Sequence, residues 1–311
     1  MRKVDTMDIV VVGSVALDTI ETPKGRIERG LGGSATHFSL AATPFAKPHI
    51  VGVVGDDFPQ EYLNMLTRYD IDIEGIKTEK GNTFFWSGVY GENFADPKSL
   101  ATELGVFADF KPVLPEKYRD IPVLFLANIH PALQIDVVNS MKDVKFIGAD
   151  TMNFWIQGER ETLVELIGKV NLLIINELEV RLLSGKDRLM PGAQDVLAMG
   201  PDILIVKQGK HGATMITKDD IFMIHAYPTY DITDPTGAGD SFAGGLMGHI
   251  ARRGKWDMQT IREGMIYGSL TASFEVEHFS TKGLEAMTEE EMAHRLRVFH
   301  KATQWPDISG V

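Results

Sequence analysis

The chain has 311 residues, and 44% of them are hydrophobic, which is enough for one large α/β domain or for one domain with a small appendage. Its net charge of −12 argues against nucleic acid or an anionic membrane surface as the main partner. The lack of cysteine excludes disulfides and thiolate metal sites. The apolar runs are too short to span a bilayer, and no signal-type stretch follows the N-terminal basic pair, so we expect a cytoplasmic protein.

Short β-branched runs alternate with amphipathic segments over the first two thirds of the chain. We expect buried strands at residues 8–13, 49–55, 123–127, 145–149, 172–175 and 203–206. Between them, apolar residues at helical spacing predict helices at residues 60–69, 133–141, 161–170 and 193–199. Because strands and helices alternate in this way, the pattern favours βαβ units and a mainly parallel sheet with helices on both faces.

Two polar segments, residues 19–30 and 82–91, interrupt this rhythm. Both are typical of antiparallel strands outside the main core, so we expect a small additional sheet. Alternation places Phe84 and Trp86 on one face, where a ring either stacks on a nucleobase or packs within the sheet or against a second subunit. We expect residues 93–102 to form a loop.

The last third of the chain has a mainly helical pattern. We expect helices at residues 237–252 and 258–274. Thr288 and Glu291 have the spacing of a capping box before another apolar helical stretch. Beyond Trp305 we expect a frayed tail.

One glycine-rich loop combines an anion-binding pattern with a nearby carboxylate. It reads Asp-Pro-Thr-Gly-Ala-Gly-Asp from Asp234 to Asp240 and runs into a helical stretch rich in small residues. A helix start presents unpaired backbone N–H groups and a positive dipole end, and glycines let a ligand approach the backbone closely. Such a site suits a phosphoryl group, and Asp240 beside it suits a base that accepts a hydroxyl proton. On this stretch alone, a glycine turn whose acid compensates the helix dipole is an equal alternative.

Other phosphate-binding motifs fit the chain poorly. A P-loop needs Lys followed by Ser or Thr, but Lys186 precedes Asp187 and Lys210 precedes His211. A dinucleotide fingerprint needs a third glycine where Phe242 stands, and it needs to follow an early strand. The sequence therefore argues against a P-loop enzyme and against a dehydrogenase, and its scattered histidines argue against a zinc site.

The same loop resembles the C-terminal signature of the PfkB, or ribokinase-like, family of carbohydrate kinases. Further stretches are similar to that family in the same order along the chain. Residues 13–18 resemble the end of the family's first strand and the aspartate that follows it. The other stretches are the glycine pair at residues 32–33, residues 52–57, the Asn-x-x-Glu of residues 176–179 and the turn at residues 207–213. The glycine pair alone is a weak signal, but the ordered set spans essentially the whole chain.

The resemblance implies an α/β fold, a ribokinase-like three-layer sandwich with a mainly parallel central sheet and a small β-sheet lid. Residues 1–311 would then form a single kinase domain, with a lid formed by about residues 18–32 and 82–105. The implied reaction moves the γ-phosphoryl of ATP to a primary hydroxyl of a sugar or of a nucleoside's ribose. It requires Mg²⁺, and K⁺ often activates it. The alternative is a non-catalytic protein of the same fold that binds a sugar or nucleoside or has a regulatory role.

The resemblance also implies roles by position. Asp240 is the expected general base, and the backbone of Gly237, Ala238 and Gly239 is the expected anion hole. Substrate binding falls to Asp18, Gly32, Gly33, Ser34 and His37, and nucleotide binding to Asn176, Lys207, Gly209, Gly212 and Thr236. Glu179 is expected to hold Mg²⁺ through water, and Asp234 is the candidate ligand for K⁺. Structural alternatives stay open for three of them, with Asp18 as a turn residue, Asn176 as a helix cap and Glu179 as a solvated helix residue.

Two departures from the family pattern bear on the loop and on the substrate. Pro235 stands where Thr is common, which fixes the entry of the glycine loop. His37 stands where many sugar kinases have Asn, and histidine still hydrogen-bonds a hydroxyl but is larger and titrates. Ser34 after the glycine pair is similar to adenosine-kinase-like members, so a sugar and a nucleoside both remain open. The edge of a lid sheet is also a natural surface for a homodimer, whereas we expect no nucleic-acid or membrane partner.

Overall fold

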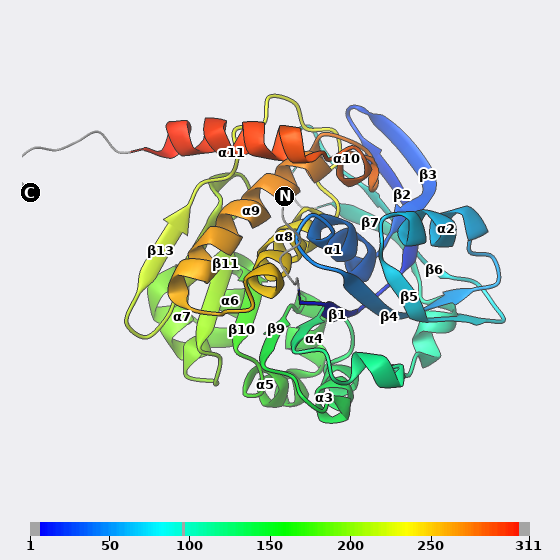
Figure 1. Ribbon diagram of the computed structural model, residues 1–311, viewed down its shortest axis with the longest axis horizontal. Coiled ribbons are helices and arrows are strands. Elements are labelled where there is room, and N and C mark those ends of the chain that lie inside the picture. Colours follow the sequence, from blue (N-terminus) through cyan, green and yellow to red (C-terminus); the bar gives the residue numbers. More distant parts are fainter. Residues whose placement is uncertain (1–6, 95–96, 305–311) are drawn as a thin grey trace, which may run out of the picture.

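The central feature of the molecule is a nine-stranded sheet with the order β13-β12-β11-β10-β9-β8-β1-β4-β5 (Figure 1). The computed structural model describes residues 7–94 and 97–304. The strands from β11 to β5 in this order are parallel, and β12 and β13 add an antiparallel edge. Their bounds are β1 (Ile9–Val12), β4 (Pro48–Gly55), β5 (Asp72–Glu79), β8 (Val123–Leu126), β9 (Phe146–Ala149), β10 (Leu172–Asn176), β11 (Ile203–Lys207), β12 (Ala213–Ile216) and β13 (Ile221–Ile224). The six strands expected in this sheet are confirmed as β1, β4, β8, β9, β10 and β11.

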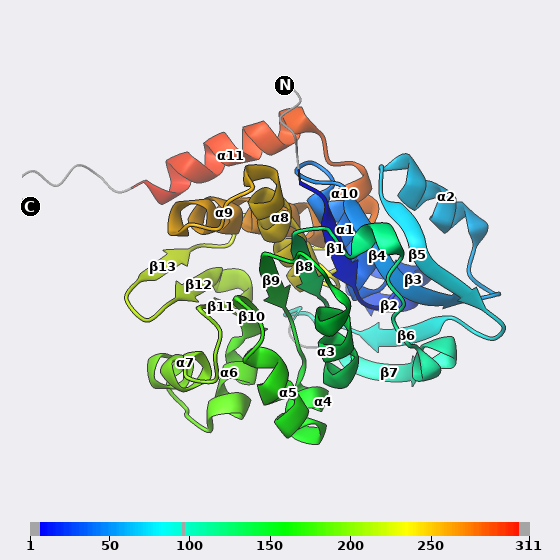
Figure 2. The same cartoon turned by 60° about the horizontal axis from the view of Figure 1, so that its bottom comes forward.

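Helices cover both faces of this sheet, so the fold has three layers (Figure 2). Their bounds are α1 (Ser34–Ala42), α2 (Gln60–Arg68), α3 (Pro131–Ser140), α4 (Asn153–Gly158), α5 (Arg160–Ile167), α6 (Glu177–Ser184), α7 (Leu189–Leu197), α8 (Ala238–Arg253), α9 (Met258–Val276), α10 (Lys282–Glu285) and α11 (Glu289–Thr303). Residues of α1, α2, α8, α9, α10 and α11 belong to one hydrophobic cluster, and residues of α3 to α7 belong to the other. The expected helices are confirmed as α2, α3, α5, α7, α8 and α9, and Thr288 caps α11 as its spacing predicts. Within the described part of the chain, no helix is both long enough and apolar enough to cross a membrane.

The first strand shows how the sequence separates the two clusters. All four residues of β1 are buried. Ile9 and Val11 belong to the cluster on the α1 and α8 side, whereas Val10 and Val12 belong to the cluster on the opposite side. Successive side chains of a strand point to opposite faces, so an uninterrupted apolar run is what a strand covered on both faces requires.

A second, four-stranded sheet lies beside this core with the order β3-β2-β6-β7 (Figure 1). Its strands are β2 (Ala16–Thr22), β3 (Gly25–Gly32), β6 (Phe84–Val89) and β7 (Lys98–Glu103), and we call it the lid sheet. The strand pairs β2–β3 and β6–β7 are antiparallel, as expected, but β2 and β6 run parallel to each other, so the sheet is mixed.

The prediction of a loop at residues 93–102 is wrong at its C-terminal end, because strand β7 begins at Lys98. Most side chains of β7 are exposed, and it pairs with β6 alone at the edge of the lid sheet. A strand of this kind lacks the alternation of apolar and polar residues by which strands are recognised, because neither of its faces is buried. The expectation for the tail beyond Trp305 lies outside the described residues.

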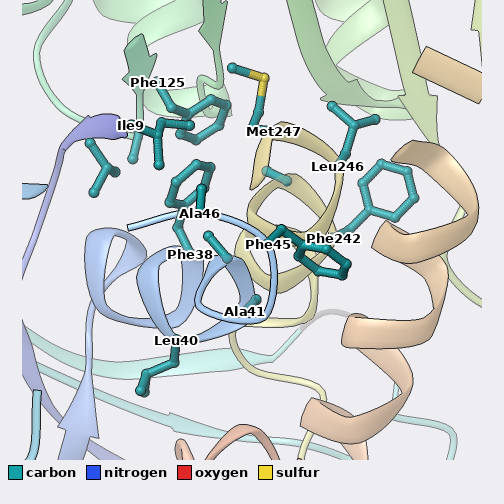
Figure 3. Close-up of a cluster of buried hydrophobic side chains, with 14 of the residues drawn as sticks. Ile9, Phe38, Leu40, Ala41, Phe45, Ala46, Phe125, Phe242, Leu246 and Met247 are labelled. Atoms are coloured by element: carbon teal, nitrogen blue, oxygen red, sulfur yellow. The ribbon is translucent and has the colours of Figure 1, made fainter. Parts of the chain in front are cut away.

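Helix α1 packs closely against α8 (Figure 3). Gly244 of α8 lies against α1 so tightly that a Cβ there would come within 2.2 Å of the Phe38 carbonyl oxygen. The Phe38 ring stacks on Phe125 of β8, with 4.4 Å between ring centroids. This packing fixes α1 between the sheet and α8, and with it the position of His37, the residue that precedes Phe38.

Candidate active site

A cleft of about 320 Å³ lies between the lid sheet and the start of α8. Ser14 and Asn128 line it just beyond the ends of β1 and β8, so it lies at the carboxyl edge of the sheet, where open α/β sheets bind ligands. The predicted site residues that line it are Asp18, Gly33, Ser34, His37, Thr236, Gly237 and Asp240. A separate cleft of about 430 Å³ around Arg295 contains none of the predicted site residues.

Two aromatic side chains of the lid also line this cleft. Phe84 and Trp86 of β6 both do so, as the alternation along this strand predicts. Phe84 also stacks on Phe107, with 5.4 Å between centroids, so part of its surface packs within the molecule. Packing within the molecule is thus confirmed for Phe84, and stacking of either ring on a nucleobase stays a prediction.

The glycine loop forms the turn that leads into α8. Gly237 has a φ of 78°, a left-handed conformation that glycine adopts without strain, and it precedes the first helical residue, Ala238. Ala238, Gly239 and Asp240 make up the first turn. The Ala238 N–H donates to the Pro235 carbonyl oxygen at 3.2 Å, whereas the N–H groups of Gly239 and Asp240 have no carbonyl one turn earlier in the helix. Burial and then the charge of Asp150 raise the pKa of Asp240 to about 6, although His37 opposes this. With this pKa the carboxylate is mainly ionised at neutral pH and able to accept a proton beside the glycine turn.

His37 lies directly beneath this turn. A Cβ on Gly237 would come within 2.4 Å of His37 Nδ1, so the ring supports the glycine from below. The same nitrogen lies 2.9 Å from Glu275 Oε1, and both side chains are buried. Burial is the largest single influence and disfavours the charged imidazole, but Glu275 together with Asp240 and Asp18 outweighs it and raises the pKa of His37 to about 9. Burial also raises the pKa of Glu275, against the influence of His37.

Asp18 belongs to β2 of the lid sheet and is buried, so the alternative of a turn residue is wrong. A Cβ on Gly32 would lie 2.0 Å from Asp18 Oδ2, and therefore only glycine leaves room for this carboxylate. Gly33 has a φ of 97°, and a Cβ there would lie 2.5 Å from the Ser14 carbonyl oxygen. The Ser34 backbone N–H donates to Ser14 Oγ at 3.0 Å. Burial raises the pKa of Asp18 to about 7, and nearby carboxylates add to the rise.

Lys207 at the end of β11 lies on the other side of the glycine turn. Its Nζ donates to Asp150 Oδ2 at 3.3 Å and lies 3.1 Å from where a Cβ on Gly239 would be. Burial disfavours its charge, but Asp150, followed by two further carboxylates, raises the pKa of Lys207. The ammonium group is thus fixed as a cation next to the glycine turn.

Asn176 and Glu179 form a capping box at the start of α6. The Glu179 backbone N–H donates to Asn176 Oδ1 at 2.9 Å, and the Asn176 backbone N–H donates to Glu179 Oε2 at 2.7 Å. The cap interpretation of Asn176 is therefore confirmed, whereas the view of Glu179 as a solvated residue is wrong, because Glu179 is buried. Asn176 is also the register partner of Lys207, which brings this cap to the same edge of the sheet.

Gly209 and Gly212 shape the turn that follows β11. Both have positive φ, of 56° and 99° respectively, and a Cβ on Gly212 would lie 2.0 Å from the Ile224 carbonyl oxygen. Neither glycine lines the cleft of about 320 Å³ described above. The turn stands at the same edge of the sheet as Lys207 but apart from the group around Asp240.

Asp234 is buried at the entry of the glycine loop. Its Oδ1 accepts the Thr236 backbone N–H at 2.9 Å, and its Oδ2 accepts the Ser280 backbone N–H at 3.2 Å. Thr236 Oγ1 lies 3.0 Å from the hydroxyl of Tyr90, which follows the lid strand β6. Burial raises the pKa of Asp234, and the hydrogen bonds that Asp234 accepts from Thr236 and Ser280 oppose the rise. Asp234 thus ties the loop to the segment after α9, while Thr236 ties it to the lid.

Three residues of this site did not emerge from sequence reasoning. Asp150 directly follows the buried strand β9, and this position at a carboxyl strand end is the signal that could have found it. Glu275 lies one residue beyond the predicted helix at residues 258–274, within the observed α9, and its burial is not readable from the sequence. Tyr90 lies within the predicted lid segment at residues 82–91, directly after the observed strand β6, but it belongs to no motif. Contacts rather than local patterns identify the last two.

Phosphate and Mg²⁺ fit the chemistry of these donors. The first turn of α8 and Lys207 supply N–H groups and positive charge, and the glycines leave space that a Cβ would fill. Asp150, Glu179 and Asp240 lie near enough to Lys207 to raise its pKa. Mg²⁺ is usually bound by one or two carboxylates together with phosphate oxygens and water, so scattered acids suffice. Among the residues described, no cluster of three or more acids and histidines forms a ready metal site without phosphate.

Comparison with known sequences identifies the family. The sequence profile of the pfkB family carbohydrate kinases matches residues 6–286. The chain is 30% identical over 254 residues to a cytidine kinase from Thermococcus kodakarensis, which covers 79% of this chain and 89% of that protein. It is 25% identical over 306 residues to a nucleoside kinase from Methanothermobacter thermautotrophicus, covering 88% of this chain and 91% of that protein. The chain belongs to the pfkB family and is a carbohydrate or nucleoside kinase of that type.

Solved structures identify the α/β ribokinase fold. The nucleoside kinase of Methanocaldococcus jannaschii matches with a TM-score of 0.76 and 22% identity, covering 94% of this chain and 99% of that one. A structure assigned to ribokinase II of Escherichia coli contains ATP and Mg²⁺, with a TM-score of 0.76, 18% identity and coverage of 94% and 99%. A fructokinase double mutant from Vibrio cholerae contains fructose, ADP and potassium, with a TM-score of 0.77, 17% identity and coverage of 94% and 100%.

Proposed function

We propose that this chain transfers the γ-phosphoryl group of ATP to the primary hydroxyl of a nucleoside's ribose, with free sugars as the competing class of acceptor. The proposal rests on the residues that line one cleft, which are the Asp240 carboxylate, the turn at Gly237, the lid carboxylate Asp18 and the two lid aromatics. The 30% identity to a cytidine kinase favours the nucleoside over the free sugar.

The acceptor side is formed by the lid and the start of α1. Asp18 accepts hydrogen bonds from sugar hydroxyls, since a carboxylate accepts two at once. We expect Gly32, Gly33 and Ser34 to let the sugar lie close to the backbone. Of these, Gly33 and Ser34 line the cleft, as does His37. Phe84 and Trp86 offer ring surface to a nucleobase, which a free sugar would leave uncovered.

The transfer step uses the groups at the start of α8. Asp240 accepts the proton of the acceptor hydroxyl while the hydroxyl oxygen forms its bond to the γ-phosphorus. The bond from that phosphorus to the bridging oxygen breaks, and ADP leaves with the electron pair. Backbone N–H groups of residues 237–239 bind the phosphoryl oxygens as charge develops on them. Lys207 adds a cation on the side of the nucleotide phosphates.

The remaining predicted residues belong to the nucleotide side. Asn176, Gly209, Gly212 and Thr236 border the nucleotide, and Glu179 contributes to Mg²⁺ binding through water. Mg²⁺ supplies charge neutralisation for the phosphates. Asp234 is the proposed carboxylate ligand of an activating K⁺. We further propose that residues 1–311 act as one catalytic unit, and a homodimer through the lid stays a prediction that sedimentation tests by a dimeric rather than monomeric mass.

A panel of pentoses, hexoses and nucleosides with ATP and Mg²⁺, read by ADP release, tests this function. We expect nucleosides, cytidine among them, to release ADP well above the acceptor-free rate. The matched control is 5′-deoxycytidine, which keeps the base and ring but lacks the hydroxyl, and which should bind without ADP release. Release with free sugars alone would move the acceptor to the other class. Binding of acceptors without any ADP release would contradict the proposal and support a non-catalytic binding protein.

A further inference from the structure

The pair formed by His37 and Glu275 is a buried charge pair that the transfer step described above does not use. His37 is 2% exposed and Glu275 is 0% exposed, and the two approach within 2.9 Å. Neither ring nitrogen of His37 makes a well-directed hydrogen bond within the described residues, and the same holds for Glu275 Oε1. Glu275 Oε2 accepts from Ser241 Oγ at 3.4 Å. Burying such a pair costs desolvation free energy, so a hydrophobic pair would serve stability as well.

The surroundings of His37 are strongly negative. Glu275 approaches it from α9, Asp240 from α8 and Asp18 from β2, and all three favour its protonated form. Asp234, before the glycine turn, also feels the charge of His37, which lowers the pKa of Asp234. These carboxylates face one imidazole from four segments of the chain. The positive charge of the His37 imidazole is therefore balanced by carboxylates within the site.

The position of His37 is as fixed as its charge. The ring lies against Gly237 so closely that a Cβ on that glycine would overlap it. The helix that carries His37 packs tightly against α8, because Gly244 and Gly248 of α8 let α1 approach at backbone contact. Gly237 also begins the anion-binding turn. The imidazole is thus held at a set distance from the place where phosphoryl oxygens would bind.

We propose that Glu275 is a positioning residue that holds His37 as a cation against Gly237, so that a fixed positive charge lies beneath the anion-binding turn and beside Asp240. This inference rests on the proposed kinase function. A preorganised charge at the point where negative charge develops stabilises the transition state more than the ground state. The same charge keeps Asp240 ionised, and the effect of His37 on the pKa of Asp240 has the corresponding sign. An asparagine in place of His37 would supply a hydrogen bond but no charge.

The test compares E275Q with E263Q, which alters the glutamate of another histidine pair on the same helix α9. In E275Q we expect kcat at pH 8 to fall roughly tenfold while the KM for nucleoside changes little, because charge and not contact is lost. A tenfold loss at pH 8 corresponds to a downward shift of the alkaline limb of the kcat profile by about two pH units. E263Q should retain the wild-type values. A folded E275Q with the wild-type pH profile would overturn the proposal.

A second measurement covers the case in which E275Q does not fold. The protonation of His37 in the unaltered protein can be followed by NMR of ¹⁵N-labelled histidine, assigned with H37N. We expect an imidazolium that persists through pH 8, and a neutral ring at pH 7 would overturn the inference. This titration does not depend on turnover. If no acceptor in the panel is phosphorylated, the proposed function fails, while the titration still decides whether His37 is a cation.

Discussion

Two histidine–glutamate pairs share helix α9 but lie in opposite electrostatic surroundings. His37 Nδ1 and Glu275 Oε1 are 2.9 Å apart, and His249 Nε2 and Glu263 Oε2 are 3.1 Å apart. The glutamate side chain is 1% exposed in the first pair and 33% exposed in the second. The geometry of the two pairs is thus similar, whereas their burial is not.

The charges around each pair explain the different states of the two histidines. Burial lowers the pKa of His249, Glu263 opposes this, and Arg253 adds to the lowering. Burial also opposes the charge of His37, but Glu275 and two further carboxylates raise the pKa of His37 to about 9. The pairing residue alone does not set the protonation of a histidine. In the first pair, Glu275 and the nearby acids Asp240 and Asp18 together outweigh burial. In the second pair, burial is the largest influence on His249, and nearby arginines add to it.

The largest expected effect comes from D240N. This variant removes a carboxylate that the His37–Glu275 pair faces and the His249–Glu263 pair does not. We expect kcat to fall by about 10² to 10⁴, the usual contribution of a general base, with nucleoside binding retained. Steady-state ADP release and calorimetric titration of nucleoside measure the two quantities. The control is E263Q, which should keep the wild-type kcat. A D240N protein with near wild-type kcat would show that another group accepts the proton.

The second expected effect concerns stability. E275A leaves His37 buried without its partner, and loss of one member of a buried pair costs about 3–5 kcal/mol. E263A removes a carboxylate that is partly exposed, so we expect the free energy of unfolding to fall by less than about 1 kcal/mol. Urea unfolding followed by circular dichroism measures both. Equal losses in the two variants would remove the distinction between the pairs.

The third effect is the dependence of activity on pH. A general base acts in its ionised form, so kcat/KM should rise with pH through about 6, the pKa of Asp240. Below that value we expect roughly a tenfold loss per pH unit, made steeper by Asp18, whose pKa is raised to about 7. H249Q, in the other pair, should show the same profile as the wild type. Activity that is constant down to pH 5 would contradict the assignment.

The smallest expected effect is that of Y90F, which removes the contact between the lid and Thr236 on the side of the first pair. Loss of one hydrogen bond costs about 0.5–1.5 kcal/mol, so the KM for nucleoside should rise about twofold to tenfold with kcat nearly unchanged. The measurement is a substrate titration at saturating ATP. A loss of kcat as large as that of D240N would show that the lid contact belongs to the transfer step.

Much of the fold was predictable, because buried parallel strands such as β1 carry an unbroken apolar signal. The site was predictable where its residues lie in short motifs, as Asp18, His37 and Asp240 do. Glu275 and Tyr90 could not be assigned in this way, since their places in the site come from contacts between segments that are far apart in the sequence, whereas the position of Asp150 at the end of a strand was a signal that could have been used. The strand β7 escaped prediction for a different reason, because its exposed side chains carry no burial pattern.

The central claim is that this cleft transfers a phosphoryl group and does not only bind a nucleoside. The most direct measurement incubates the protein with cytidine, Mg²⁺ and ATP labelled at the γ-phosphate, and identifies the labelled product by mass spectrometry. We expect the label on the primary hydroxyl of the nucleoside, in an amount equal to the ADP formed and nearly absent with D240N. Label that appears as inorganic phosphate alone, or remains on ATP while nucleosides bind, would contradict the account.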